Sequence, residues 1–337
     1  MGLLLNGPAA PIRSPWSGTQ LRRIVLSDLA GVKSGEVCRQ DAMRIPAIVR
    51  SRGLICGTLA RHPLTVHDYA TGAQVDTPGW ATSTATRQSP SQRMLWTLDD
   101  LLFAGLSVWA VQRDGGPDGP IVDAIRIDPA LWTIDPDGLG VIVQGEPAPD
   151  DEVLIFEGPQ DGLLTIAEDA IRASRALAHA WQQRVTAPVP LMAIKQTDPN
   201  VQLDDDEIDQ MIVDSEQARA AGGTVFVPPG FDLDALGAAQ APDLYVEGRN
   251  ADRIDWANMV GLPAAMIDGS MTTASLTYST AEGKRSEFVD YSLNYWAAAV
   301  EARLSQDDVV PEGQYVRFDI SWLTTPTQPG TNAPQED

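Results

Sequence analysis

Apolar residues recur at helical spacing in several stretches of the chain. In residues 92–106, for example, Leu95, Leu98, Leu102 and Leu106 fall on one side of a helix. A recurrence every three or four residues is typical of an amphipathic helix that packs one face on a core. The sequence predicts helices over residues 43–61, 92–106, 163–187, 204–221, 242–260 and 278–304.

Between these helices the apolar positions alternate with polar ones, as they do in half-buried strands. Gly, Pro and Asp residues separate the alternating runs and predict tight turns, such as the turn at 114–119. The predicted strands cover residues 64–69, 108–113, 121–127, 132–134, 141–143, 153–156, 191–195, 224–227 and 314–322. Helices packed on a small antiparallel sheet give the α+β fold class.

Two of the predicted helices differ from ordinary surface helices. Residues 163–187 form the longest periodic stretch, a rod of about 37 Å at 1.5 Å per residue, and Pro188 follows it. The last helix carries apolar residues on two sides. One side has Phe288, Tyr291 and Tyr295, and the other has Val289, Trp296, Val300 and Leu304. Both apolar sides of such a helix must be buried, one against its own domain and the other against something else. We therefore expect a seam with a second copy of the chain on this helix.

Both ends of the chain lack a sustained period. Residues 1–40 are rich in Gly, Pro and Ser and are expected to form an arm, and residues 326–337 are expected to form a disordered tail. No run reaches the roughly 18 apolar residues that a membrane span needs, and the start shows no secretory signal. We therefore expect no membrane partner and no export.

The net charge is −22, from 46 Asp and Glu against 24 Lys and Arg. A protein that grips nucleic acid through its phosphates needs the opposite balance, so tight binding of DNA over the whole surface is excluded. An acidic wall past which DNA slides stays compatible with this charge. Arginines such as Arg249 and Arg253 then supply local contacts.

The sequence contains no phosphate-binding G-x-x-x-x-G-K-[ST] loop, no G-x-S-x-G elbow and no H-E-x-x-H motif. The histidines His62, His67 and His179 are scattered, and we expect them at surface or capping positions. Cys38 and Cys56 are expected to be reduced thiols. We predict no enzyme activity, no cofactor and no metal, although a hydrolase that uses carboxylate pairs stays an alternative because such pairs meet only in three dimensions.

Four consecutive acidic residues open the predicted helix at 204–221. They could hold a hard cation, or they could complement the positive end of the helix dipole, which we favour. The residues are Asp204, Asp205, Asp206 and Glu207. The tryptophans fall at apolar periodic positions, so we expect them in cores or interfaces rather than in base stacking.

The order of these elements resembles the portal proteins of long-tailed bacteriophages. The resemblance covers residues 45–305 and rests on five segments in the same order. They are IVRSRGLICGTLARHPL (48–64), WTLDDLLFAG (96–105) followed by IDPALW (127–132), EVLIFEG (152–158), RIDWANMVGLP (253–263) and STAE (279–282).

The resemblance implies a portal-type protomer with these parts: an N-terminal arm (1–40), a wing in two pieces (41–162 and 278–325), two stem helices (163–187 and 242–262), a clip (188–241), a tunnel loop (263–277) and the disordered tail (326–337). Little follows the last helix, so the crown is expected to be minimal or absent. The implied function is a ring, in the family usually of twelve copies, at one capsid vertex through which DNA is packaged and ejected.

The resemblance also implies partners and site residues. The partners are further copies of the chain, the major capsid protein, the terminase large subunit, a head-tail adaptor and double-stranded DNA bound without sequence preference. The implied location is the virion, with the host cytoplasm during assembly. Another connector or adaptor ring protein is the alternative.

We assign three sets of residues on this basis. The tunnel loop that faces DNA comprises Asp268, Gly269, Ser270, Met271, Thr272 and Thr273. The clip docking surface comprises Asp204, Asp205, Asp206 and Glu207, and the subunit seam comprises Phe288, Tyr291, Tyr295 and Trp296.

Overall fold

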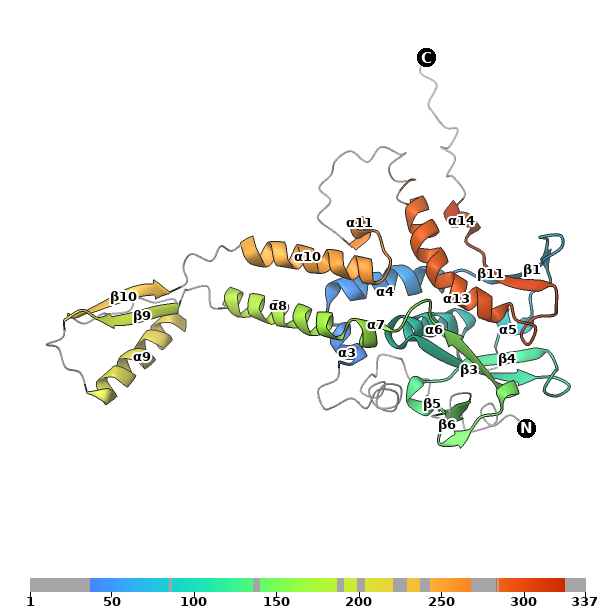
Figure 1. Ribbon diagram of the computed structural model, residues 1–337, viewed down its shortest axis with the longest axis horizontal. Helices are drawn as coiled ribbons and strands as arrows, with labels where there is room; N and C mark the ends of the chain where they lie inside the picture. Colours follow the sequence, from blue (N-terminus) through green and yellow to red (C-terminus); the bar gives the residue numbers. More distant parts are fainter. Residues whose placement is uncertain are drawn as a thin grey trace, which may run out of the picture. The chain divides into compact units, whose positions relative to one another are not determined.

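The computed structural model describes residues 37–84, 87–135, 140–186, 191–198, 204–220, 229–236, 243–267, 283 and 285–324. The chain divides into two compact units (Figure 1). Unit 1 comprises Met1–Arg172 and Arg253–Asp337, and unit 2 comprises Ala173–Asp252. Both contain helices and strands, as the α+β prediction requires.

Unit 1 is built around helix α6 (Pro90–Ala104), which packs against α4 (Pro46–Leu59) and strand β3 (Leu106–Arg113). The Ser89 side chain accepts a hydrogen bond from the Gln92 amide and Pro90 opens the first turn, which together fix where α6 begins. Gly105 ends the helix in a left-handed conformation, with φ of +80°.

Three small antiparallel sheets surround these helices. The first has the order β4–β3–β8, with β4 at Ile121–Arg126 and β8 at Val153–Glu157. The second has the order β11–β1–β2, from Gln314–Phe318, Leu64–Asp68 and Gln74–Val75. The third has the order β5–β6–β7, from Trp132–Ile134, Val141–Val143 and Glu146–Pro147. In the second sheet a strand from near the C-terminus pairs with one from the N-terminal part, which ties the two halves of unit 1 together.

The remaining helices of unit 1 are short or lie at its edges. They are α3 (Arg39–Ala42), α5 (Gly79–Thr82), η1 (Pro129–Leu131), η2 (Asp150–Glu152), α7 (Leu163–Ile166), α11 (Ala264–Ile267), the π-helix η3 (Phe288–Leu293), α13 (Asn294–Leu304) and α14 (Ser321–Thr324). Helix α13 packs on β11 and β8.

Tryptophans fill the core of unit 1. Trp109 packs against Phe156, with ring centroids 4.6 Å apart, and against Trp80 at 6.3 Å. Its indole nitrogen donates to the Thr97 hydroxyl at 2.7 Å, which satisfies the only polar group of the ring. Trp132, Trp256 and Trp296 are also fully buried. The prediction of tryptophans as core residues is confirmed for these five side chains.

Two buried carboxylates of α6 hold three arginines. Asp99 accepts hydrogen bonds from Arg39, at 2.7 and 2.9 Å, and from Arg52. Asp100 accepts two from Arg126. Burial raises the pKa of Asp100 to about 6, so this carboxyl is still ionised and paired at pH 7.

The backbone just before β3 lies in direct contact with the backbone just before α7. The two residues at this contact are Gly105 and Gly162. A Cβ atom placed on Gly162 would lie 2.3 Å from the Phe103 carbonyl oxygen, and one on Gly105 would lie 2.8 Å from the Gly162 nitrogen. Real side chains do not approach backbone this closely, so a larger residue at 162 must push the two segments apart.

We expect Gly162→Ala to destabilise the chain by about 1–3 kcal/mol through this overlap. Gly53→Ala is the matched control, because Gly53 lies in α4 with nothing within 4 Å of the added Cβ. That control is expected to stabilise the chain by about 0.4–1 kcal/mol. Urea unfolding followed by circular dichroism measures both, and equal effects of the two substitutions would contradict the close approach.

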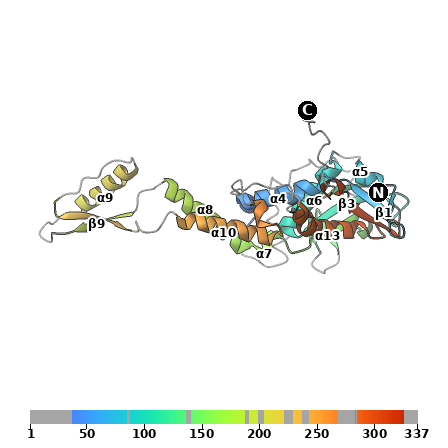
Figure 2. The same ribbon diagram turned by 90° about the horizontal axis from the view of Figure 1, so that it is seen from above.

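Unit 2 contains a helix pair and a two-stranded antiparallel sheet. The later part of α8 (Glu168–Thr186) and the first part of α10 (Asp243–Met259) belong to it, and β9 (Leu191–Gln196) pairs antiparallel with β10 (Phe231–Leu236). Helix α9 (Asp205–Ala220) connects the two strands in sequence and lies beside this sheet (Figures 1 and 2).

The structure corrects three predicted boundaries. Residues 37–40 belong to the folded core rather than to the arm, because α3 places Arg39 on Asp99. The predicted helix over 163–187 is interrupted, since Ala167 leaves helical geometry between α7 and α8. The last strand ends at Phe318, not at residue 322, and α14 follows it.

Other predictions fall on residues that the structure does not describe. These are the strand at 224–227, the first part of the helix predicted from residue 278, the arm up to residue 36 and the tail at 326–337. His62, expected at a surface or cap, is buried, and its Nδ1 lies 2.7 Å from the Asp319 carbonyl oxygen. Cys38 and Cys56 are free thiols, as predicted, and both are buried.

Candidate functional site

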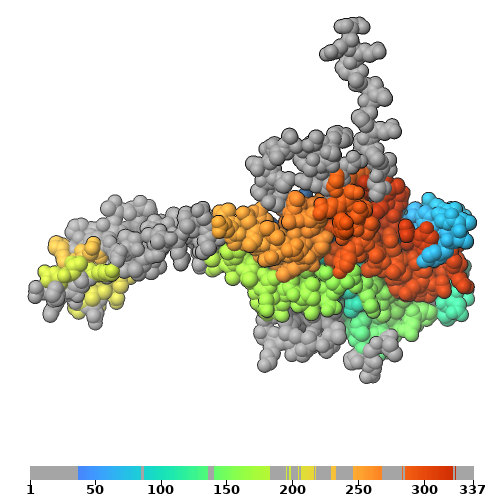
Figure 3. Space-filling view, turned by 45° about the horizontal axis from the view of Figure 1, so that its top comes forward, coloured from blue at the N-terminus to red at the C-terminus, as the bar shows by residue number. Residues whose placement is uncertain are grey.

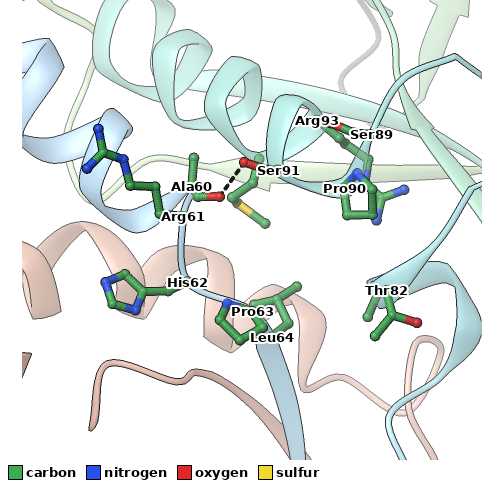
Figure 4. Close-up of a pocket in the computed structure, with 12 residues that line it drawn as sticks. Ala60, Arg61, His62, Pro63, Leu64, Thr82, Ser89, Pro90, Ser91 and Arg93 are labelled. Atoms are coloured by element: carbon green, nitrogen blue, oxygen red, sulfur yellow. Dashed lines mark hydrogen bonds between the residues drawn. The ribbon is translucent and has the colours of Figure 1, made fainter. Parts of the chain in front are cut away.

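One pocket in unit 1 has serine and histidine residues in its lining. It lies where the end of α4 meets the start of α6, between Ser91 and Leu64 (Figure 4). Ser91 donates to the Ala60 carbonyl oxygen at 2.7 Å, and Ser89 caps α6. His62 directs its Nδ1 to the Asp319 carbonyl rather than to either serine. The hydroxyls of this pocket are therefore used in the fold, and no nucleophile is paired with a base there.

Arg93 also lines this pocket and is almost completely buried. Its guanidinium donates to the carbonyl oxygens of Ala124 and Trp80, and it lies 4.7 Å from the centre of the Trp109 ring. Burial lowers its pKa to about 10, which leaves it charged at pH 7. Arg93 joins α6 to α5 and β4 and is a structural residue.

Among the described residues, no group of three or more His, Cys, Asp or Glu side chains is placed to hold a metal ion. The acidic run at the start of α9 has a local use instead. The Asp204 amide donates to the Glu207 carboxylate at 3.1 Å, and the Ile208 amide donates to the Asp204 carbonyl oxygen in the first regular hydrogen bond of the helix. The Glu207 contact is one half of a capping box, so the capping interpretation has direct support for Glu207. No described helix is long and apolar enough to span a bilayer.

Helix α9 presents both charge and apolar surface. Asp204, Asp206 and Glu207 are exposed, and so are Ile208 and Ile212 on the same helix. These two isoleucines are exposed next to the acidic residues Asp204–Glu207, for which a docking surface is predicted. The acidic run indicated its charge, but nothing in the sequence pattern separated these isoleucines from core residues.

Within unit 2, helices α8 and α10 contact each other side by side. The Ser174 hydroxyl donates to the Asp252 carboxylate. Further along, a Cβ on Gly248 would touch the Leu177 side chain at 3.9 Å, and the Arg249 guanidinium lies 4.5 Å from the Trp181 ring centre. The contact residues rise in number along α8, from Ser174 to Trp181, while their partners fall from Asp252 to Arg249 and Gly248 along α10. The two helices are therefore antiparallel.

The predicted subunit seam splits into two buried and two exposed residues. Trp296 is 0% exposed and donates to the Val260 carbonyl oxygen at 3.0 Å, and Phe288 is also buried. Both are core residues of their own protomer, which corrects their assignment to the seam. Tyr291 is 74% exposed and Tyr295 is 39% exposed. The segments that contain them, η3 and α13, belong to the orange-to-red part of the chain in Figure 3.

The π-helix η3 explains this split. Residues 288–293 make i to i+5 hydrogen bonds, so their side chains do not follow the 3.6-residue period used in the prediction. Ser292 donates to the Gly261 carbonyl oxygen at 2.6 Å and fixes the inward side of η3. The register change turns Phe288 inward and Tyr291 outward, although α-helical spacing places them on one face.

The predicted tunnel loop, Asp268–Thr273, lies outside the described residues. The described chain before it ends at Ile267, a buried residue of α11, and resumes at Gly283 and Arg285. Before the predicted loop, Arg50 of α4 donates to the Met266 carbonyl oxygen of α11 at 3.4 Å.

Comparisons with known proteins agree on one family. A sequence model described as "Phage portal protein" matches residues 46–329. The crystal structure of an HK97 family phage portal protein from Corynebacterium diphtheriae is 33% identical, covers 86% of this chain and 98% of its own, and superposes with a TM-score of 0.70. Comparison with curated proteins gives no match.

Two more distant structures share the fold. The neck of an empty gene transfer agent particle, computed with C6 symmetry, is 18% identical, covers 83% of this chain and 82% of its own, and has a TM-score of 0.57. The neck of the native particle, computed with C12 symmetry, is 17% identical, has the same coverage and has a TM-score of 0.55.

Proposed function

Because this chain belongs to the phage portal protein family, we propose that its copies form the portal ring at one vertex of a phage capsid. The carrying observation is the 33% identity to a portal protein that this chain matches over nearly all of that protein's length. The role is structural. The ring is the channel for packaging and ejection of DNA, and its subunits number twelve, as in the C12 neck of similar fold.

We assign the parts of the chain to the parts of a portal protomer. Unit 1 is the wing, and the antiparallel pair α8 and α10 forms the stem. The sheet β9–β10 with α9 is the clip, and residues 263–277 are the tunnel loop. The Ser174–Asp252 hydrogen bond and the Trp181–Arg249 stack support the stem assignment, because they join the two helices at more than one level.

The charge of the chain suits a channel that DNA crosses without sticking. Each copy carries −22, and a ring multiplies this charge around its axis. Like charge repels the phosphate backbone, so DNA is held away from the walls and meets few strong contacts. Exposed arginines of the stem, such as Arg249, then provide weak local contacts to phosphates.

The clip is the docking surface for the terminase large subunit and later for the head-tail adaptor, and the wing meets the major capsid protein. Support for the clip comes from α9, whose exposed carboxylates and isoleucines form a surface suited to a partner with basic and apolar residues. The assembled ring is located in the virion, after assembly in the host cytoplasm.

We expect Asp206→Asn with Asp209→Asn to slow the association of the terminase large subunit by about tenfold at low salt, because exposed charges mainly steer the encounter of two proteins. Surface plasmon resonance at several salt concentrations measures the rate constant. Asp114→Asn, at an exposed turn of unit 1, is the control. An unchanged rate with the α9 variant would remove α9 from the docking surface.

Electron microscopy of the purified full-length chain tests the portal assignment. A portal is expected to assemble without partners into a ring with an axial hole, seen end-on in negative stain. An adaptor-type connector would instead need a preassembled ring before it oligomerises. A chain that stays monomeric at all concentrations and shows hydrolase activity would overturn the proposal.

A further inference from the structure

The sheet β11–β1–β2 has one face on the core and one face turned outward. Leu64, Val66, Val316 and Phe318 are buried on the inner face. The antiparallel register pairs Thr65 with Arg317 and His67 with Tyr315. Because side chains alternate along a strand, these two pairs lie together on the outer face.

Aromatic rings and a guanidinium line up on this outer face. The His67 ring stacks on Tyr315 at 5.4 Å, with 21° between the planes, and the Tyr69 ring centroid lies 4.7 Å from that of Tyr315. The Arg317 guanidinium lies 5.2 Å from the Tyr315 ring centre. We call His67, Tyr69, Tyr315 and Arg317 the aromatic row. Tyr69 is 66% exposed, so the row is open at this end.

The β11 edge of this sheet is closed to a further strand. The Val316 amide donates to the Ser305 hydroxyl at 2.9 Å, and the Phe318 amide donates to the Glu301 carboxylate at 2.9 Å. These side chains, in α13 and directly after it, occupy amides that an added strand would need. The strand at the other edge, β2, has only two residues, so the outer face offers more surface to an incoming segment than either edge. Exposed aromatic side chains are the groups on which proline-rich segments dock in the polyproline conformation.

The chain carries a proline-rich segment shortly after β11, following α14. Residues 326–329 read P-T-Q-P, a P-x-x-P pattern, and a third proline follows at Pro334. The segment 325–337 contains Glu336 and Asp337 and no Lys or Arg. Its charge is therefore opposite to that of Arg317.

The segment is long enough to reach the aromatic row. It follows α14, which begins three residues after β11 ends. Strand residues 315–318 cover about 10 Å and one turn of helix adds about 6 Å, while thirteen extended residues span up to about 45 Å. Residues 1–36, the other terminal segment, carry four basic and two acidic residues, so their net charge does not complement Arg317.

We propose that residues 325–337 dock on the aromatic row of their own chain, with Pro326 and Pro329 against the rings of Tyr69 and Tyr315 and the acidic residues toward Arg317. Asp319, two residues after Arg317, is an acidic residue that alternation along the strand would place on the same face. Its carboxylate already accepts a hydrogen bond from the Ser321 amide at 3.1 Å. Docking covers an exposed aromatic surface that would otherwise be open to unrelated proteins.

Hydrogen exchange of the full-length chain, followed by mass spectrometry, tests the proposal. We expect the amides of residues 327–337 to exchange at least tenfold more slowly than in an unstructured peptide of the same sequence. The double variant Tyr69→Ser with Tyr315→Ser is expected to bring them back to the unstructured rate. The double variant Pro326→Ala with Pro329→Ala changes the segment instead of the aromatic row, and it is also expected to return these amides to the unstructured exchange rate.

Two controls make each outcome decisive. Tyr291→Ser removes an exposed tyrosine from another surface and is expected to leave the exchange of residues 327–337 unchanged. Thermal unfolding of every variant checks that the sheet is intact. Unstructured exchange rates in the unsubstituted chain would overturn the proposal. Slow exchange that survives the loss of Tyr69 and Tyr315 would overturn it as well, since the segment would then bind elsewhere.

Discussion

Replacing Asp99 with alanine is expected to lower the free energy of unfolding by about 3–5 kcal/mol, because the substitution leaves buried charges without their counterion. The Asp99 side chain is 1% exposed, and the Arg39 side chain is 2% exposed. Arg52 contacts the same carboxylate from α4. One substitution therefore removes the carboxylate from two guanidinium groups that have almost no access to water.

Urea denaturation of the purified chain measures this loss, with Asp114→Ala as the control at an exposed turn, expected within about 0.5 kcal/mol of the parent. A second variant separates charge from packing. Asp99→Leu combined with Arg39→Met and Arg52→Met removes all three charges and is expected to recover most of the lost stability. A change below 1 kcal/mol for Asp99→Ala would show that other groups neutralise the two arginines.

The Asp99 contact also decides where the folded part of the chain begins. Arg39 lies in α3, far from Asp99 in sequence, and its guanidinium also lies 5.1 Å from the Phe103 ring. Composition alone placed residues 37–40 in the arm because they carry no apolar period. The period cannot reveal an anchor that consists of a single ion pair, so this boundary was not accessible from the sequence.

Elements with a strong local signal were predicted well. The helix at α6 has a cap, an opening proline and a closing glycine, and its predicted range of 92–106 differs from Pro90–Ala104 by two residues at each end. The strands β1, β3, β4, β5, β6 and β8 lie where the alternation predicted them. Propensity, caps and turns all act within a few residues, and the sequence displays them directly.

Surfaces were predicted less well than elements. The seam assignment relied on a constant 3.6-residue period, and η3 breaks that period by inserting a wider turn. The pairing of β1 with β11 joins residues about 250 positions apart, so the aromatic row exists only after folding. A surface made from two distant strands has no signature in either strand alone.

The proposal of a subunit seam now rests on the two exposed tyrosines of η3 and α13, Tyr291 and Tyr295. In a cyclic ring every protomer uses one surface on one side and a different surface on the other, so one substitution alters every interface. Tyr291 is the cleaner probe, because it is 74% exposed. Tyr295 donates its hydroxyl hydrogen to the Pro159 carbonyl oxygen at 3.1 Å, so its loss also weakens the protomer.

We expect Tyr291→Asp to prevent ring formation while the protomer stays folded, because a carboxylate without a partner would be buried at each interface. At a cost of about 3 kcal/mol for each interface, the concentration needed for assembly rises by more than a hundredfold. Mass photometry is expected to show mainly particles near the 36.2 kDa of a single chain.

Val122→Asp introduces the same charge at another exposed apolar residue of unit 1 and is expected to leave rings intact. Trp296→Asp is expected to unfold the protomer instead, because Trp296 is buried and donates to Val260. The two variants of this helix should therefore differ in circular dichroism: Tyr291→Asp keeps the parent spectrum and Trp296→Asp loses it. Rings of normal size with Tyr291→Asp would place the seam on a different surface of the protomer.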